Sequence, residues 1–214
     1  MKIEVPKNVK VGDIIVAKYE KSNLNYVSWE DYHHAALVSE INPLKIIEAV
    51  GGEKGDREGV KEVLFSESRN FGQSDSEIEK IVWLKPKFPK VIREKKIWWE
   101  FMPEISEIEA RQKAVDYARQ QIGEPYSIDP QIATKNQEKV WYCSLLIFKS
   151  YSRTVANMYL ESKPLIETDD EDGEIDVDEI TFRTCVAKIK NGPMVTPEDL
   201  VKSTKTIIYH EWKK

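Results

Sequence analysis

The residue in this chain whose chemistry is most easily identified is a cysteine at the start of an apolar run. Cys143 opens the segment C-S-L-L-I-F (143–148), which predicts a buried helix that begins at the cysteine. The free N–H groups and the dipole of a helix N-terminus lower the pKa of a thiol, and the thiolate that forms attacks carbonyl carbon. The alternative interpretation is a buried cysteine that only packs.

The base that would activate Cys143 has few candidates, because the chain contains only three histidines. His33 and His34 are neighbours in a predicted strand, Tyr32–Ser39, and neighbouring side chains of a strand point to opposite faces. At most one of these two can therefore face the helix. His210 lies in a predicted strand near the end of the chain with no acid partner, and we interpret it as structural.

A second predicted strand, Lys45–Val50, supplies an acid that would complete a catalytic triad. A short turn centred near Ile41 places residue 34 opposite Glu48 and residue 33 opposite Ala49. Directly opposed side chains have Cβ atoms about 4.5–5.5 Å apart, so Glu48 would accept a hydrogen bond from His34 and fix its tautomer. A slip of one residue would turn Glu48 to the other face. The alternative is an edge strand with Glu48 in water.

A tyrosine between two predicted helices is the candidate for stabilising an oxyanion. The first helix covers about 107–122, begins after Ser106 with a capping-box pattern and stops at Gly123. Tyr126 follows the Gly-x-Pro turn. Its hydroxyl would donate to a developing oxyanion together with the backbone N–H of Cys143. A tyrosine that merely packs in a loop is the alternative.

The remaining elements give the fold class. Short connections favour antiparallel pairing of the N-terminal strands, and the helix that begins at Cys143 is expected to extend to about residue 160. A further helix starts at Pro197 with Thr196 as its cap. The sequence thus predicts an α+β fold in one domain covering 1–214. The other strands are predicted at 14–19, 60–66, 78–84 and 206–212.

Composition excludes several classes of protein. Hydrophobic residues make up 41% and charged residues 32% of the chain, which is typical of a soluble globular protein. The net charge of −5 argues against a nucleic-acid binder. No window approaches the roughly 20 apolar residues of a membrane helix, so no membrane anchor is expected. The first ten residues lack the apolar region of a secretory signal, which predicts a cytoplasmic protein.

Cysteine and histidine are too few for a zinc site of the usual kind, so neither a metal nor a cofactor is expected. A disulfide between Cys143 and Cys185 is an alternative that a reducing compartment disfavours. Cys185 is interpreted as part of a packed strand. Residues 168–179 nearly fit a calcium loop, but Thr168 replaces the first acid, and we interpret the segment as a solvated acidic loop. The basic cluster 85–96 is interpreted as a solvated connector rather than a phosphate or polyanion patch.

Together these motifs resemble the circularly permuted branch of the NlpC superfamily of papain-like cysteine hydrolases, the YiiX-like proteins, which are related to lecithin retinol acyltransferase-like proteins. Histidine and acid precede the cysteine, as in that branch, and the match spans roughly residues 10–155. Leu145 departs from the pattern, because the branch often has Glu after Cys-Ser. The matching motifs are Y-H-H-A-A-L-V (32–38), I-I-E-A-V (46–50), G-E-P-Y (123–126) and W-Y-C-S-L-L-I-F (141–148).

The resemblance implies a papain-like fold, in which an antiparallel, partly closed sheet packs against the helix that carries the nucleophile. It assigns Cys143 as nucleophile, His34 as base, Glu48 as the third polar residue and Tyr126 as a residue that helps to hold the oxyanion. Tyr126 and Tyr142 are the candidate substrate-binding residues.

Ordinary members of the superfamily, in which the cysteine precedes the histidine, hydrolyse amide bonds in cell-wall peptides, often next to D-glutamate. The resemblance therefore implies a cysteine peptidase or amidase whose partner is a peptide or a small substrate containing an amino acid. Two alternatives stay open: a thioesterase or lipid acyltransferase with the same triad, and a non-catalytic binding module. Residues 160–195 carry little of the resemblance and are a candidate insertion or lid.

Overall fold

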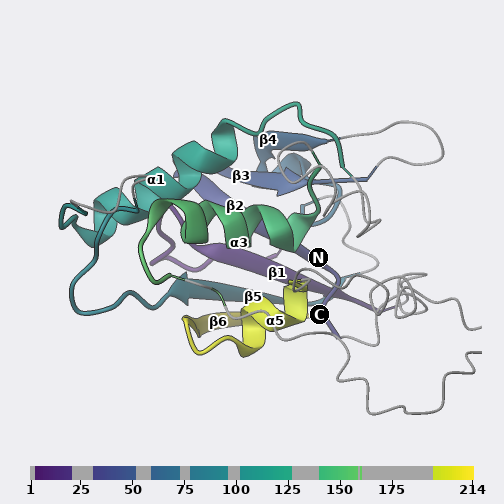
Figure 1. Cartoon of the computed structure of the whole chain (residues 1–214). Helices are drawn as coiled ribbons and strands as arrows, with labels where there is room; N and C mark the ends of the chain where they lie inside the picture. The colour runs from purple at the N-terminus through teal and green to yellow at the C-terminus, as the bar shows by residue number, and fades with distance from the viewer. Residues whose placement is uncertain are drawn as a thin grey trace, which may run out of the picture.

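Six antiparallel strands form the sheet on which the rest of the molecule is built. The structure is a computed structural model, and it describes residues 3–20, 31–51, 59–72, 78–95, 102–126, 140–158, 160 and 195–214. The strand order is β4-β3-β2-β1-β5-β6, which places β2 and β1 in the middle of the sheet (Figure 1). The predicted α+β class with an antiparallel sheet is confirmed. The strands are β1 (Ile14–Tyr19), β2 (His34–Ile41), β3 (Leu44–Ala49), β4 (Val60–Leu64), β5 (Ile78–Pro86) and β6 (Thr206–Lys213).

Two helices, α1 (Glu107–Arg119) and α3 (Cys143–Thr154), pack against each other and against β2 and β3. Figure 1 shows them lying across one face of the sheet, with the short α5 (Pro197–Lys202) beside β6. A single turn of 3₁₀ helix, η2 (Phe65–Glu67), follows β4. Within the described part of the chain, no helix is long and apolar enough to cross a membrane.

Both faces of the sheet are covered by apolar packing, because successive residues of each strand point to opposite faces. Val16, Leu37 and Ile47 join a core with Val115 of α1 and Leu146 of α3. The alternate residues form a second core on the other face. Its members include Ile15, Ile46, Phe65, Phe71, Trp83 and Trp212.

Helix α3 is shorter than predicted, because the chain leaves it to pair with another segment. It ends at Thr154 instead of near residue 160. Val155 adopts an extended conformation and forms an antiparallel bridge with Glu94, and the N–H of Ala156 donates to the carbonyl of Arg93. This pairing fixes the segment around residue 94, which was expected to be a solvated connector. The expected connector also begins inside β5, which continues to Pro86.

Helix α1 also ends earlier than predicted, at Arg119 instead of 122. The N–H groups of residues 121 and 122 donate to carbonyls three residues back, which is a tighter turn than an α-helix makes. Gly123 follows with a φ of 90°, a conformation that favours glycine. Both predicted helix caps are confirmed, since Ser106 and Thr196 each cap their helix in a capping box.

The β2–β3 hairpin has a different centre from the predicted one. Leu37 pairs with Ile47 and Ile41 pairs with Leu44, so the turn is the two-residue segment Asn42–Pro43. A register shift lies between residues 38 and 40. The predicted register, with residue 34 opposite residue 48, is therefore wrong, because continuing the observed pairing places residue 36 opposite residue 48.

The packing of α3 on the sheet yields a prediction about stability. Leu146 is 0% exposed in the core between the helices and the sheet, so Leu146→Ala should lower the free energy of unfolding by about 2–5 kcal/mol. Ile108 of α1 is 80% exposed, and Ile108→Ala should change it by less than about 0.5 kcal/mol. Urea denaturation of both variants measures the difference, and equal effects would contradict this packing.

Candidate active site

His34 and Glu48 form a buried hydrogen-bonded pair at one end of the sheet. The Nε2 of His34 lies 2.8 Å from Oε2 of Glu48, and the side chain of Glu48 is 0% exposed. The contact that the sequence predicted is therefore present, although the register is not the predicted one. The error is two residues, and an even shift leaves both side chains on the same face. They meet as diagonal neighbours, which long side chains can bridge.

Two residues from the turn after β4 complete the surroundings of Glu48. The hydroxyl of Ser68 donates to Oε1 at 2.9 Å, and the amide of Asn70 donates to Oε2 at 3.2 Å. The ring of Phe71 packs against the ring of His34, with centroids 5.5 Å apart. A carboxylate that is fully withdrawn from water needs such partners, because burial without them is costly. Sequence reasoning missed Ser68 and Asn70, since nothing local links them to Glu48.

Cys143 is the first residue of α3, as predicted, and it is buried. Unlike α1 and α5, this helix has no side-chain cap, because Tyr142 at the N-cap position offers no acceptor to the first turn. The N–H of Ser144 in that first turn instead donates to the sulfur. The first turn also contains no acidic residue that would compete with a thiolate.

A strand backbone supplies another donor to the sulfur. The N–H of Ala35 in β2 is hydrogen-bonded to Cys143. The recorded pairing of β2 with β3 begins only at Leu37, so Ala35 lies where the two strands have stopped pairing. Because β3 does not pair with Ala35, the N–H of Ala35 can bond the sulfur of Cys143, next to His34 in the same strand.

The charges of this site favour a thiolate. Burial by itself would raise the pKa of the Cys143 thiol. The hydrogen bond and positive charge of His34 oppose that effect, as do the two backbone N–H groups, and the net result is a lowered pKa. Cys143 is a free thiol in the structure.

The imidazole of His34 is correspondingly easy to protonate. Burial by itself would lower its pKa, but hydrogen bonds and opposite charges from Cys143 and Glu48 raise it to about 9. Burial would raise the pKa of Glu48, and its hydrogen bonds to His34, Asn70 and Ser68 lower it instead. At neutral pH, Glu48 is therefore a carboxylate and His34 is an imidazolium, and the charge of that imidazolium shifts Cys143 toward its thiolate.

Tyr126 lies close enough to Cys143 for the charge of Cys143 to shift the pKa of the Tyr126 hydroxyl. Burial first, and then the negative charge of Cys143, raise the pKa of Tyr126, so its hydroxyl remains a donor. Gly51, just after β3, makes room for the ring: a Cβ there would lie 2.9 Å from Cε1 of Tyr126. Tyr126 also forms a parallel bridge with Trp141, which ties the Gly-x-Pro-Tyr turn to the approach to α3.

Tyr142, the other candidate substrate-binding residue, is buried. Its hydroxyl accepts a hydrogen bond from the N–H of Val195 at 3.4 Å. The hydroxyl of Ser144 donates to the carbonyl of the same Val195 at 2.7 Å. The segment before α5 therefore lies against the first turn of α3, and the hydroxyl of Tyr142 has a backbone partner.

The other residues singled out from the sequence do not join this site. His33 precedes β2, and its Nδ1 accepts a hydrogen bond from the N–H of Tyr19 at 3.3 Å. His210 pairs with Trp83 in the sheet, and its Nε2 is buried with no hydrogen-bond partner among the described residues. Cys185 and the acidic segment 168–179 lie outside the described residues.

No group of three or more metal-ligating side chains gathers within the described ranges. Comparisons with family models, with curated proteins and with solved structures find no match to this chain.

The lowered pKa of Cys143 predicts rapid alkylation at neutral pH. In the unaltered chain, the rate with iodoacetamide should fall only when the pH drops below this lowered pKa, where the thiolate is protonated. His34→Ala removes the main group that lowers the pKa and leaves the burial that raises it. The pKa of Cys143 should therefore rise, and the rate at pH 7 should fall with the thiolate fraction.

His33→Ala is the matched control for this measurement, because it removes the neighbouring imidazole and should leave the rate unchanged. A Cys143→Ala protein gives the background from Cys185. Equal rates in the His34 and His33 variants would mean that His34 does not activate the thiol.

Proposed function

We propose that this protein is a cysteine hydrolase that cleaves amide bonds through an acyl-enzyme. One observation carries the proposal. Cys143, His34 and Glu48 form a buried chain of hydrogen bonds, and their pKa shifts favour the thiolate–imidazolium form. A structural cysteine would not need an uncapped helix, two backbone donors and a charged imidazole around its sulfur.

The first half of the reaction uses the resting ion pair. The thiolate of Cys143 attacks the substrate carbonyl carbon, and a negative charge forms on the carbonyl oxygen. The hydroxyl of Tyr126 and the N–H of Cys143 are the donors assigned to that oxygen. When the C–N bond breaks, the imidazolium of His34 gives its proton to the leaving amine, and a thioester remains on the sulfur.

The second half regenerates the enzyme. Neutral His34 takes one proton from water, and the hydroxide attacks the thioester carbonyl. The C–S bond breaks, the acid product leaves, and the thiolate and imidazolium are restored. Glu48 keeps its negative charge throughout, so its role is to orient the ring and stabilise the imidazolium.

The substrate class follows from the resemblance to the permuted NlpC-type hydrolases. The arrangement of an antiparallel sheet with the cysteine helix packed on it is compatible with the papain-like fold of that family. Under this proposal the substrate is a peptide derived from the cell wall, cleaved at an amide bond next to D-glutamate.

A defined peptide panel tests this function. Peptides with an amide bond next to D-glutamate, and their L-glutamate isomers, are incubated with the protein, and release of free amine is measured. We expect turnover of the D-isomers, no turnover by Cys143→Ala, and an acyl adduct on the unaltered chain by intact mass. Full turnover by Cys143→Ala would refute the mechanism. Turnover of acyl thioesters without turnover of peptides would refute the substrate class.

The role assigned to Tyr126 gives a separate prediction. Loss of one oxyanion donor typically lowers kcat about 10²–10³-fold, so Tyr126→Phe should reduce kcat on that scale with little change in KM. Tyr142→Phe is the matched control, because that hydroxyl is bonded to the backbone of Val195. If the two variants behave alike, Tyr126 only packs.

A further inference from the structure

A pocket lies at the other end of the sheet from Cys143. It has a volume of about 380 Å³ and is lined by the segment before β1, the end of β5 and residues of α1 and β6. Asp13 is among its lining residues, next to Ile14, which pairs with Leu37 in β2. His34 is the first residue of β2 and pairs with Ala17, three residues further along β1 than Ile14. The pocket is therefore separate from the candidate active site.

The pocket is rich in positive charge in a chain whose net charge is −5. Three lysines, Lys10, Lys85 and Lys87, line it together with Arg111. None of these three lysines forms an ion pair with another residue in the described part of the chain. Two of them belong to the basic cluster that the sequence shows at 85–96.

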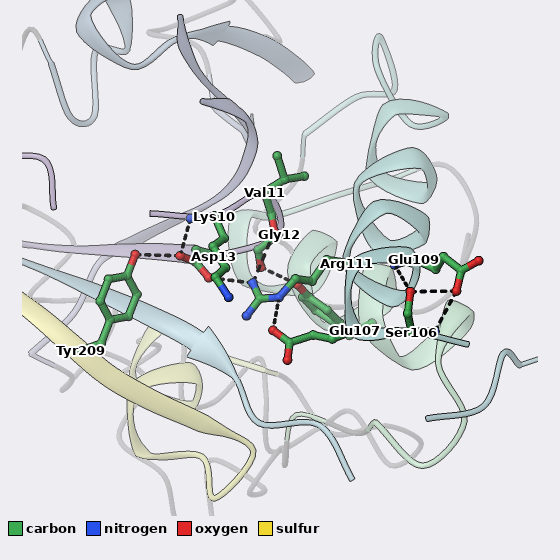
Figure 2. A network of polar contacts seen from close by, with 10 residues as sticks. Lys10, Val11, Gly12, Asp13, Ser106, Glu107, Glu109, Arg111 and Tyr209 are labelled. Carbon is green, nitrogen blue, oxygen red and sulfur yellow. Dashed lines mark hydrogen bonds and ion pairs between the residues drawn. The ribbon is translucent and has the colours of Figure 1, made fainter. Parts of the chain in front are cut away.

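The two acids of the pocket are hydrogen-bonded inside the protein, and Arg111 forms an ion pair with each of them (Figure 2). Asp13 accepts hydrogen bonds from the N–H of Lys10 at 2.9 Å, from Arg111 at 2.7 Å and from the hydroxyl of Tyr209 at 2.7 Å. Glu107 accepts from Nε of Arg111 at 2.8 Å. Arg111 offsets one of their two negative charges, and the four basic side chains that line the pocket still exceed its two acids by two charges.

One wall of the pocket is aromatic. The ring of Phe88 lies beneath the guanidinium of Arg111, at 5.6 Å from centroid to carbon, and both residues line the pocket. The side chain of Arg111 is only 5% exposed, so this wall and the carboxylates around it are fixed by packing. A ligand could place its charged part among the lysines and a small uncharged part against Phe88.

We propose that this pocket binds a small, multiply charged anion of the phosphate-ester class. Ammonium groups form strong, charge-assisted hydrogen bonds to phosphate oxygens, and three lysines at one cavity match a ligand with two or more negative charges. The volume suits a small molecule rather than a nucleic acid, which fits the acidic net charge of the chain. The proposal does not depend on the activity of Cys143.

Calorimetric titration of the full chain with inorganic pyrophosphate tests this site. We expect one bound pyrophosphate per chain, and weaker binding at higher salt because the contacts are ionic. Removing two charge-assisted contacts in a Lys85→Gln, Lys87→Gln double variant should weaken binding at least about tenfold. These lysines are exposed, so the variant should fold normally, which circular dichroism checks.

Two controls make the outcome decisive. Lys90→Gln removes an exposed lysine of the same segment that does not line the pocket, and Cys143→Ala disables the candidate nucleophile. Both should bind pyrophosphate as the unaltered chain does. An absence of binding at millimolar pyrophosphate, an equal loss in Lys90→Gln, or tighter binding of an oligonucleotide than of pyrophosphate would each overturn the proposal.

Discussion

The buried carboxylate of Glu48 is the constraint on which the candidate site depends. An unpaired charge at that depth would be strongly destabilising, so the protein must supply donors for it. His34, Ser68 and Asn70 supply them from β2 and from the turn after β4. Hydrogen bonds and opposite charges from Cys143 and Glu48 together raise the pKa of His34 to about 9, and the imidazolium in turn lowers the pKa of Cys143.

The three helices differ in whether a side chain caps the free N–H groups of the first turn. Helices α1 and α5 begin with capping boxes, which satisfy their free N–H groups with side-chain oxygens. Helix α3 begins without one, although a polar residue in place of Tyr142 would cap it. Its first turn therefore keeps donors for the sulfur of Cys143. A capping side chain would stabilise the helix, but it would also place a competing acceptor beside the N–H groups of the first turn.

The sequence correctly predicted that His34 and Glu48 share a face of the sheet, but it did not predict which residues of β2 and β3 pair. The alternation of side chains along β2 and β3 depends only on strand periodicity, so an error of two residues in register still placed His34 and Glu48 on one face. The register itself depends on the Asn42–Pro43 turn and on a bulge, which no local pattern specified. Ser68 and Asn70 could not be predicted, because their contact with Glu48 exists only after β4 packs beside β3.

The position of Cys143 also depends on contacts at the far end of its helix. The hydroxyl of Tyr151, near the end of α3, donates to the carbonyl of Gly12, and a Cβ at Gly12 would lie 2.9 Å from that hydroxyl oxygen. Gly12 has a φ of 81°, so glycine suits both the space and the backbone. At the other end, Ser144 is bonded to Val195. A helix fixed at both ends cannot slide or rotate freely, and for this reason the sulfur stays in contact with His34.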